Sequence, residues 1–147
     1  MPKEGETTME LEDARSVTRE EELEASPEEV WRALTDESIL RLWLGEEVEL
    51  DARPGGVVRV RDDGEERSGR VEDVDEPRRL AFTWAREGEL PALVEFELAP
   101  TDSGTKLSVT ETAPRGVPIH LAGAGWPLSA FALRGALAPV TVPSSAL

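Results

Sequence analysis

The alternation of apolar and polar residues along the chain predicts a sheet of seven strands. Residues 17–24 alternate between a partly apolar set and a wholly polar set, which is the pattern of a strand with one solvent face. The pattern recurs in six short segments between residues 46 and 112, divided by turn-forming sequences such as 53–56 and 62–64. We therefore expect an antiparallel meander, with the inward residues Val48, Leu50, Val58, Val60, Gly69, Val71, Leu80, Phe82, Trp84, Val94, Phe96, Leu98, Leu107 and Val109.

Two short helices are predicted between the first and second strands. Ser26 is a favoured N-cap residue, Pro27 suits the first helical position, and Glu29 completes a capping box. A second helix is expected to begin after Asp36 as its N-cap and to end before Gly45. The apolar stripes of the pair consist of Val30, Trp31, Leu34, Ile39, Leu40 and Trp43.

A long carboxy-terminal helix is predicted to cover the apolar face of the sheet, because each strand leaves one such face to be buried. Its apolar residues, Trp126, Ala130, Leu133 and Leu137, recur at helical spacing. The expected fold class is α+β, a seven-stranded antiparallel sheet wrapped around this helix. Residues 1–8 are expected to be disordered, residues 9–138 to form the domain, and residues 139–147 to be a tail.

Composition narrows the classes of partner. The chain of 147 residues has no cysteine, which excludes disulfides, thiolate metal sites and a cysteine nucleophile. Its net charge of -15 disfavours binding to nucleic acid and to anionic membranes. The acidic amino terminus lacks the basic and apolar regions of a secretory signal, so we expect a cytoplasmic protein.

Local sequences along residues 9–138 resemble one family. They include residues 25–35 and 41–45, the turn at 53–56, the strand sequences 79–84 and 94–98, and Gly125-Trp126. Together they resemble the Hsp90-ATPase-activator-like branch of the START/Bet v 1-type superfamily. The resemblance implies a helix-grip fold with a cavity for a small apolar molecule between sheet and long helix. Some relatives are instead interaction proteins, and a few are cyclases or hydrolases.

Candidate cavity residues follow from the inward positions and the last helix. Trp31 and Trp43 are expected to belong to the core of the helix pair, whereas Trp84 and Trp126 are better placed to contact an aromatic ligand. The predicted cavity lining is Val60, Phe82, Trp84, Phe96, Val109, Glu111, Trp126, Ala130 and Leu133.

Acid or base chemistry has three candidates: Glu21, Glu111 and His120. The two glutamates have inward parity on strands that would be neighbours, so they form a possible proton-sharing pair. The alternative is that a bulge turns Glu21 to solvent or that an arginine such as Arg19 neutralises it. His120 is the only histidine, so a histidine-based metal site is excluded, and we expect no metal or cofactor.

The leading hypothesis is non-enzymatic binding of a small, largely apolar ligand. The alternative is an interaction module that resembles the chaperone activator domain, and a cyclase or hydrolase is the third reading. Leu128 and Phe131 add apolar surface to the last helix and predict a protein partner or a homodimer contact there.

Overall fold

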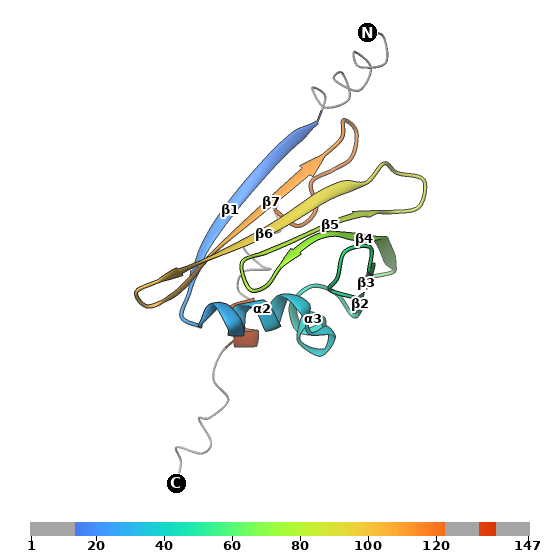
Figure 1. Cartoon of the computed structure of the whole chain (residues 1–147). Helices are drawn as coiled ribbons and strands as arrows, with labels where there is room; N and C mark the ends of the chain where they lie inside the picture. The colour runs from blue at the N-terminus through green and yellow to red at the C-terminus, as the bar shows by residue number, and fades with distance from the viewer. Residues whose placement is uncertain (1–13, 123–132, 138–147) are drawn as a thin grey trace.

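A computed structural model describes residues 14–122 and 133–137 of the chain. In this part the strands form one seven-stranded antiparallel sheet in the order β1-β7-β6-β5-β4-β3-β2 (Figure 1). The elements in chain order are β1 (Arg15–Leu23), α2 (Pro27–Thr35), α3 (Glu37–Trp43), β2 (Glu47–Leu50), β3 (Val57–Asp62), β4 (Glu65–Asp75), β5 (Arg79–Ala85), β6 (Ala92–Thr101) and β7 (Gly104–Ala113).

The pairing of the first and last strands closes the meander at one edge. β1 runs beside β7 from Arg15 opposite Ala113 to Leu23 opposite Thr105. This confirms the expected neighbour relation of the two strands. We call the face of the sheet that carries the buried side chains the inner face. Of the predicted inward residues, Val48, Val58, Val60, Val71, Leu80, Phe82, Trp84, Val94, Phe96, Leu98, Leu107 and Val109 are buried.

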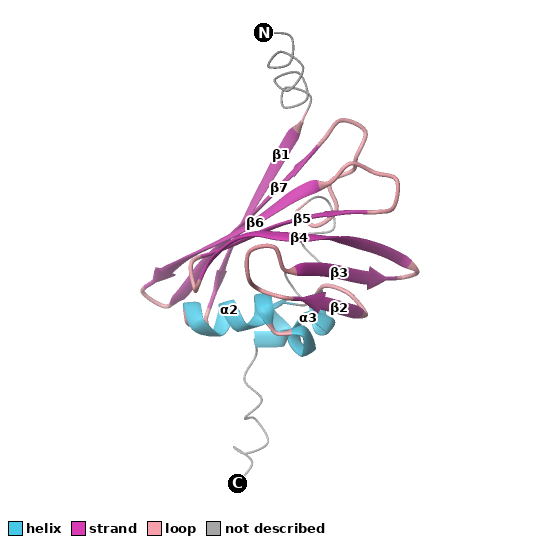
Figure 2. Ribbon diagram, turned by 45° about the vertical axis from the view of Figure 1, so that its right-hand side comes forward, coloured by secondary structure: helices cyan, strands magenta, loops and turns pink. Residues whose placement is uncertain are grey.

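The two predicted helices form and lie at one end of the sheet (Figure 2). In α2 the Ser26 hydroxyl accepts a hydrogen bond from the Glu29 backbone N–H, and the Glu29 carboxylate accepts one from the Ser26 backbone N–H. Asp36 caps α3 through the Ser38 backbone N–H at 2.8 Å. The Trp43 indole N–H donates to the carbonyl oxygen of Ala33 at 2.9 Å and so ties α3 to α2.

Residues 133–137 are helical and lie at the same end of the molecule as α2. Leu133 is completely buried in the core, and the guanidinium of Arg134 forms an ion pair with the Glu21 carboxylate on β1. The rest of the predicted long helix, with Trp126 and Ala130, lies outside the described residues. The segment 1–8, which was expected to be disordered, and the expected tail 139–147 also lie outside the described residues.

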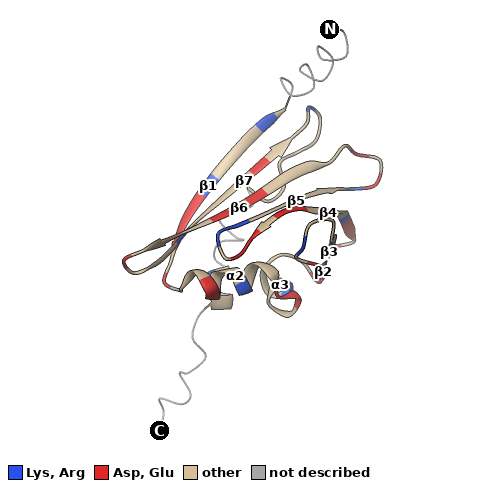
Figure 3. Cartoon of the chain, viewed as in Figure 1, with Lys and Arg blue, Asp and Glu red and all other residues tan. Residues whose placement is uncertain are grey.

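Charged residues lie along the strands (Figure 3), and the exposed positions among them form the outer face of the sheet. Arg79 on β5 donates hydrogen bonds to three carboxylates there, those of Asp73, Glu95 and Glu97, at 2.8 to 3.1 Å. A polar outer face leaves the inner face to hold the core. No helix in the described ranges is long and apolar enough to cross a membrane.

Candidate functional site

An aromatic strip runs along the inner face. The ring of Phe82 lies edge-on to Trp84 at a centroid distance of 5.4 Å, and it contacts Phe96 at 6.1 Å. Phe82 therefore links the other two predicted cavity residues, Trp84 on the same strand β5 and Phe96 on the adjacent strand β6. Val60, Val109 and Leu133 are buried in the same core. Trp126 and Ala130 lie outside the described residues.

The end of the inner face beneath α2 and α3 is filled by side chains. The space left there is about 10 Å³, which is the size of one water molecule. It is lined by Leu34, Leu40, Leu44, Val48, Leu50, Val58, Val60, Phe82 and Phe96. A ligand therefore has no room between the two short helices and the sheet.

The other end of the strip is polar and is built around Trp84. A second small pocket, also of about 10 Å³, lies between this ring, Arg67, Glu111 and His120. Glu89, Ala92, Val117, Pro118 and Ala85 complete its lining. The pocket joins strands β4, β5, β6 and β7 with the segment that follows β7, so residues far apart in sequence meet here.

Arg67 is a residue of this site that sequence reasoning missed. It pairs with the buried Val60 across β3 and β4, which places its side chain on the inner face. Its guanidinium lies 5.6 Å from the centre of the Trp84 ring, and its side chain is only 13% exposed. Burial, followed by the repulsion of Arg86, lowers the pKa of Arg67 from its ordinary value. Strand parity was the available signal in the sequence. Gly69 and Val71 were predicted to face inward, and Arg67, two residues before Gly69, has the same parity.

Glu111 is buried, and both of its carboxylate oxygens accept hydrogen bonds from backbone N–H groups. One carboxylate oxygen accepts hydrogen bonds from the N–H groups of Leu121 at 2.6 Å and Ala122 at 2.9 Å. The other oxygen accepts from the N–H of His120 at 3.1 Å. Three successive backbone N–H groups therefore converge on this side chain, as in other backbone anion nests. The group is a clamp for residues 120–122.

Glu21 and Glu111 are not brought together. Glu21 faces Leu107, whereas Glu111 faces Val17, four residues along the same pair of strands. Four residues span about 13 Å along a strand. Glu21 is neutralised by an arginine, as one of the sequence alternatives had it, but the arginine is Arg134 from the helical segment. A proton-sharing pair of these two carboxylates is thus excluded by the register.

His120 sits at the mouth of the pocket. The residue is exposed, yet its ring packs edge-on against Trp84 at 5.6 Å. Burial of the ring against its neighbours and the positive charge of Arg67 lower its pKa below 6.5, so the imidazole is neutral at pH 7. In the described residues there is no cluster of three or more groups that would hold a metal ion.

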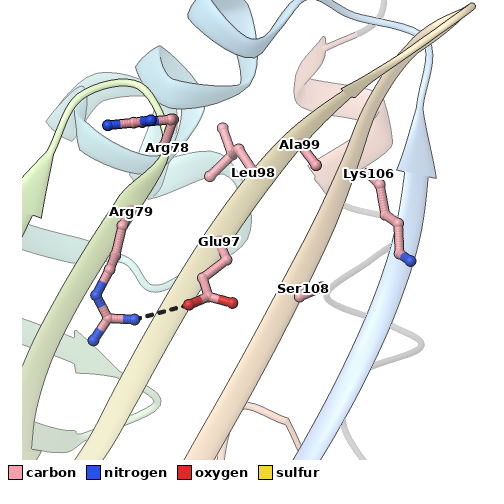
Figure 4. Close-up of a pocket in the computed structure, with 7 residues that line it drawn as sticks. All are labelled: Arg78, Arg79, Glu97, Leu98, Ala99, Lys106 and Ser108. Carbon is pink, nitrogen blue, oxygen red and sulfur yellow. Dashed lines mark hydrogen bonds and ion pairs between the residues drawn. The ribbon is translucent and has the colours of Figure 1, made fainter.

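A shallow groove of about 370 Å³ lies on the outer face (Figure 4). It is lined by Arg78, Arg79, Glu97, Leu98, Ala99, Lys106 and Ser108. The charged groups in it already have partners within the sheet: Arg79 binds Glu97, and Lys106 lies 3.5 Å from Glu20. The charged groups of the groove are therefore already paired within the sheet, and the inner face is the better candidate for a ligand site.

The architecture defines the class of protein. An antiparallel seven-stranded sheet with two short helices between β1 and β2 is the arrangement of the Bet v 1-like fold. The family model described as activator of Hsp90 ATPase homolog 1-like protein matches residues 24–138, and the chain belongs to this family. A search of curated protein sequences found no significant match.

Several solved structures are similar to this chain. CalU16 from Micromonospora echinospora is 28% identical with a TM-score of 0.73, over 90% of this chain and 82% of that one. CV1439 from Chromobacterium violaceum is 26% identical with a TM-score of 0.72, over 84% and 97% of the two chains. MLL2253 from Mesorhizobium loti is 25% identical with a TM-score of 0.71, over 84% and 96%.

Proposed function

We propose that the protein is a non-enzymatic binding module for a small, largely apolar molecule held on the inner face at the Trp84 end of the aromatic strip. The strip of Phe82, Trp84 and Phe96 is the observation that carries the proposal. Aromatic rings offer large apolar area in defined orientations, and apolar burial contributes about 25 cal/mol per Å². The α2–α3 end is filled, so the ligand would lie between the sheet and the carboxy-terminal segment.

The state of the candidate acid and base groups supports a binding role over catalysis. The oxygens of Glu111 are occupied by three backbone N–H groups, and Glu21 is engaged by Arg134. His120 has no carboxylate hydrogen-bonded to its ring among the described residues. A general base needs a free lone pair within hydrogen-bond reach of a substrate proton. The alternative of a chaperone-activator module stays a prediction, supported by the family description and the acidic charge.

A neutral apolar dye tests the proposal. N-phenyl-1-naphthylamine fluoresces strongly only in apolar surroundings, so its titration reports access to the inner face. We expect saturable binding of one dye per chain. The variant Val109→Phe adds bulk to the inner face, where Val109 is opposite Phe96, and is expected to weaken binding.

Thr110→Phe is the matched control, because the Thr110 hydroxyl contacts Thr18 on the opposite face of the sheet. It should leave dye binding unchanged. Circular dichroism spectra must show both variants folded. The proposal fails if the dye does not bind saturably, or if the two variants weaken binding equally.

A further inference from the structure

The charged groups around the Trp84 pocket differ in whether they have hydrogen-bond partners. Glu89 accepts a hydrogen bond from Arg86 at 2.5 Å, and Glu111 accepts three from backbone N–H groups. In the described part of the chain Arg67 donates no hydrogen bond, and the Glu65 carboxylate is 3.8 Å away, too far for one. Arg67 is therefore the charged group at this pocket whose donors are unused.

Unused donors on a largely buried guanidinium are costly. The group carries five N–H donors, and a buried donor without an acceptor is destabilising. Its position over the Trp84 ring offsets part of this cost, but a ring face attracts the positive charge and does not accept directional hydrogen bonds from each N–H group. A fold that places an arginine this way leaves it ready for an acceptor that is not part of the described chain.

We infer that the molecule bound on the aromatic strip carries an anionic group, of the carboxylate or sulfonate kind, that binds the guanidinium of Arg67. The inference rests on the proposed function. The ligand class is an amphipathic monoanion, with its apolar body and its charge both held at the Trp84 end of the inner face. A planar guanidinium binds such oxyanions through two parallel N–H donors, and charge-assisted bonds of this kind are roughly twice as strong as neutral ones.

Admission of the anionic group requires a small movement at the pocket mouth. The free space among the lining side chains is about 10 Å³, enough for one water molecule and too small for a carboxylate. Pro118 and His120 are the exposed members of the lining, and the side chain of His120 donates no hydrogen bond within the described residues. The inference therefore requires the His120 ring to turn away from Trp84, which would open the pocket from the solvent side.

Two dyes of the same ring system test the inference. 1-Anilinonaphthalene-8-sulfonate is N-phenyl-1-naphthylamine with an added sulfonate, so the pair isolates the effect of the charge. We expect Arg67→Met, which keeps an apolar stem, to weaken binding of the sulfonate dye about tenfold to a hundredfold. Binding of the neutral dye should change less than about twofold, and Arg67→Lys should weaken the sulfonate dye by less than Arg67→Met does.

Arg59→Met is the matched control. Arg59 lies on the neighbouring strand, is 55% exposed and pairs with Glu49 at 2.7 Å, so its loss changes the net charge but not the pocket. It should leave both dyes unaffected. If Arg67→Met binds the sulfonate dye as tightly as the parent does, or loses both dyes equally, the inference is overturned while the proposed function stands. If the parent binds neither dye, the proposed function fails and the inference with it.

Discussion

The carboxylate of Glu111 holds the backbone N–H of Leu121 at 2.6 Å, and through this contact the end of β7 fixes the start of the carboxy-terminal segment. The same oxygen also binds Ala122. On the other side, Arg19 of β1 donates to the carbonyl oxygen of Ala122 at 3.0 Å. Residues 120–122 are thus held by charged side chains from two adjacent strands, the edge strand β1 and its neighbour β7.

The clamp predicts a large loss of stability in Glu111→Gln. The amide replaces one carboxylate oxygen with a donor that points at backbone N–H groups, and one or two buried donors lose their acceptor. We expect the free energy of unfolding to fall by about 2–4 kcal/mol, measured by urea denaturation.

Glu72→Gln is the control for that experiment, because Glu72 is exposed on β4. Its effect should stay within about 0.5 kcal/mol, as for surface substitutions in general. Equal stabilities of the two variants would show that the carboxylate of Glu111 is not a clamp.

Gly69 is predicted to be required beside Trp84. A Cβ atom at this position would lie 1.8 Å from the carbonyl oxygen of Thr83, which no small shift relieves. Gly69→Ala should therefore lower the free energy of unfolding by about 1–3 kcal/mol or more. Gly135→Ala meets no atom within 4 Å and lies in a helix, so it should raise stability by up to about 1 kcal/mol. Thermal unfolding of the two variants tests this prediction. It would be contradicted if the midpoint temperatures of both variants shifted in the same direction.

His120 is predicted to make stability depend on pH in the mildly acidic range. Burial and Arg67 lower its folded-state pKa below 6.5, against the opposing attraction of Glu111, Glu65 and Asp62. The unfolded state then binds more protons than the folded state, so stability is full above pH 6.5 and is lost as the pH falls toward the folded-state pKa.

His120→Gln removes this proton binding. The stability of the parent relative to the variant should therefore decline between about pH 7 and pH 5, measured by urea unfolding at each pH. A difference that stays constant or grows as the pH falls would show that the pKa of His120 is not lowered.

The capping box of α2 is expected to contribute to the free energy of unfolding. Ser26→Ala removes the acceptor of the Glu29 backbone N–H and should cost about 1 kcal/mol. Ser68→Ala, on the exposed side of β4, is the control and should change stability by less than about 0.5 kcal/mol. The helix cap would be unimportant if the two alanine variants unfolded at the same denaturant concentration.

The features predicted correctly from the sequence are those with a local signature. The parity of inward residues follows from strand geometry, so the burial of Phe82, Trp84 and Phe96 was readable from alternation alone. The caps at Ser26 and Asp36 depend on residues two or three positions away and were equally readable.

The contacts within the site were harder to predict from the sequence. They depend on the register of the strands and on residues 120–122, which show no periodic pattern. The sequence assigned Glu21 and Glu111 to neighbouring strands. Their separation depends on the register of these strands, which the structure fixes by pairing Glu21 with Leu107. The three backbone donors to Glu111 come from residues with no periodicity. Arg67 was missed because a charged residue in a strand is normally assigned to the solvent face, although its parity placed it inside.

The most direct test of the central claim is the indole N–H signal of Trp84 in ¹H–¹⁵N NMR spectra during a titration with N-phenyl-1-naphthylamine. The proposed binding site predicts a saturable shift of this signal at one dye per chain. The signal of Trp43, whose indole is hydrogen-bonded to Ala33 beneath the filled α2–α3 end, should stay in place. A Trp84 signal that does not move, or a Trp43 signal that moves as much, would contradict a ligand site at the Trp84 end of the inner face.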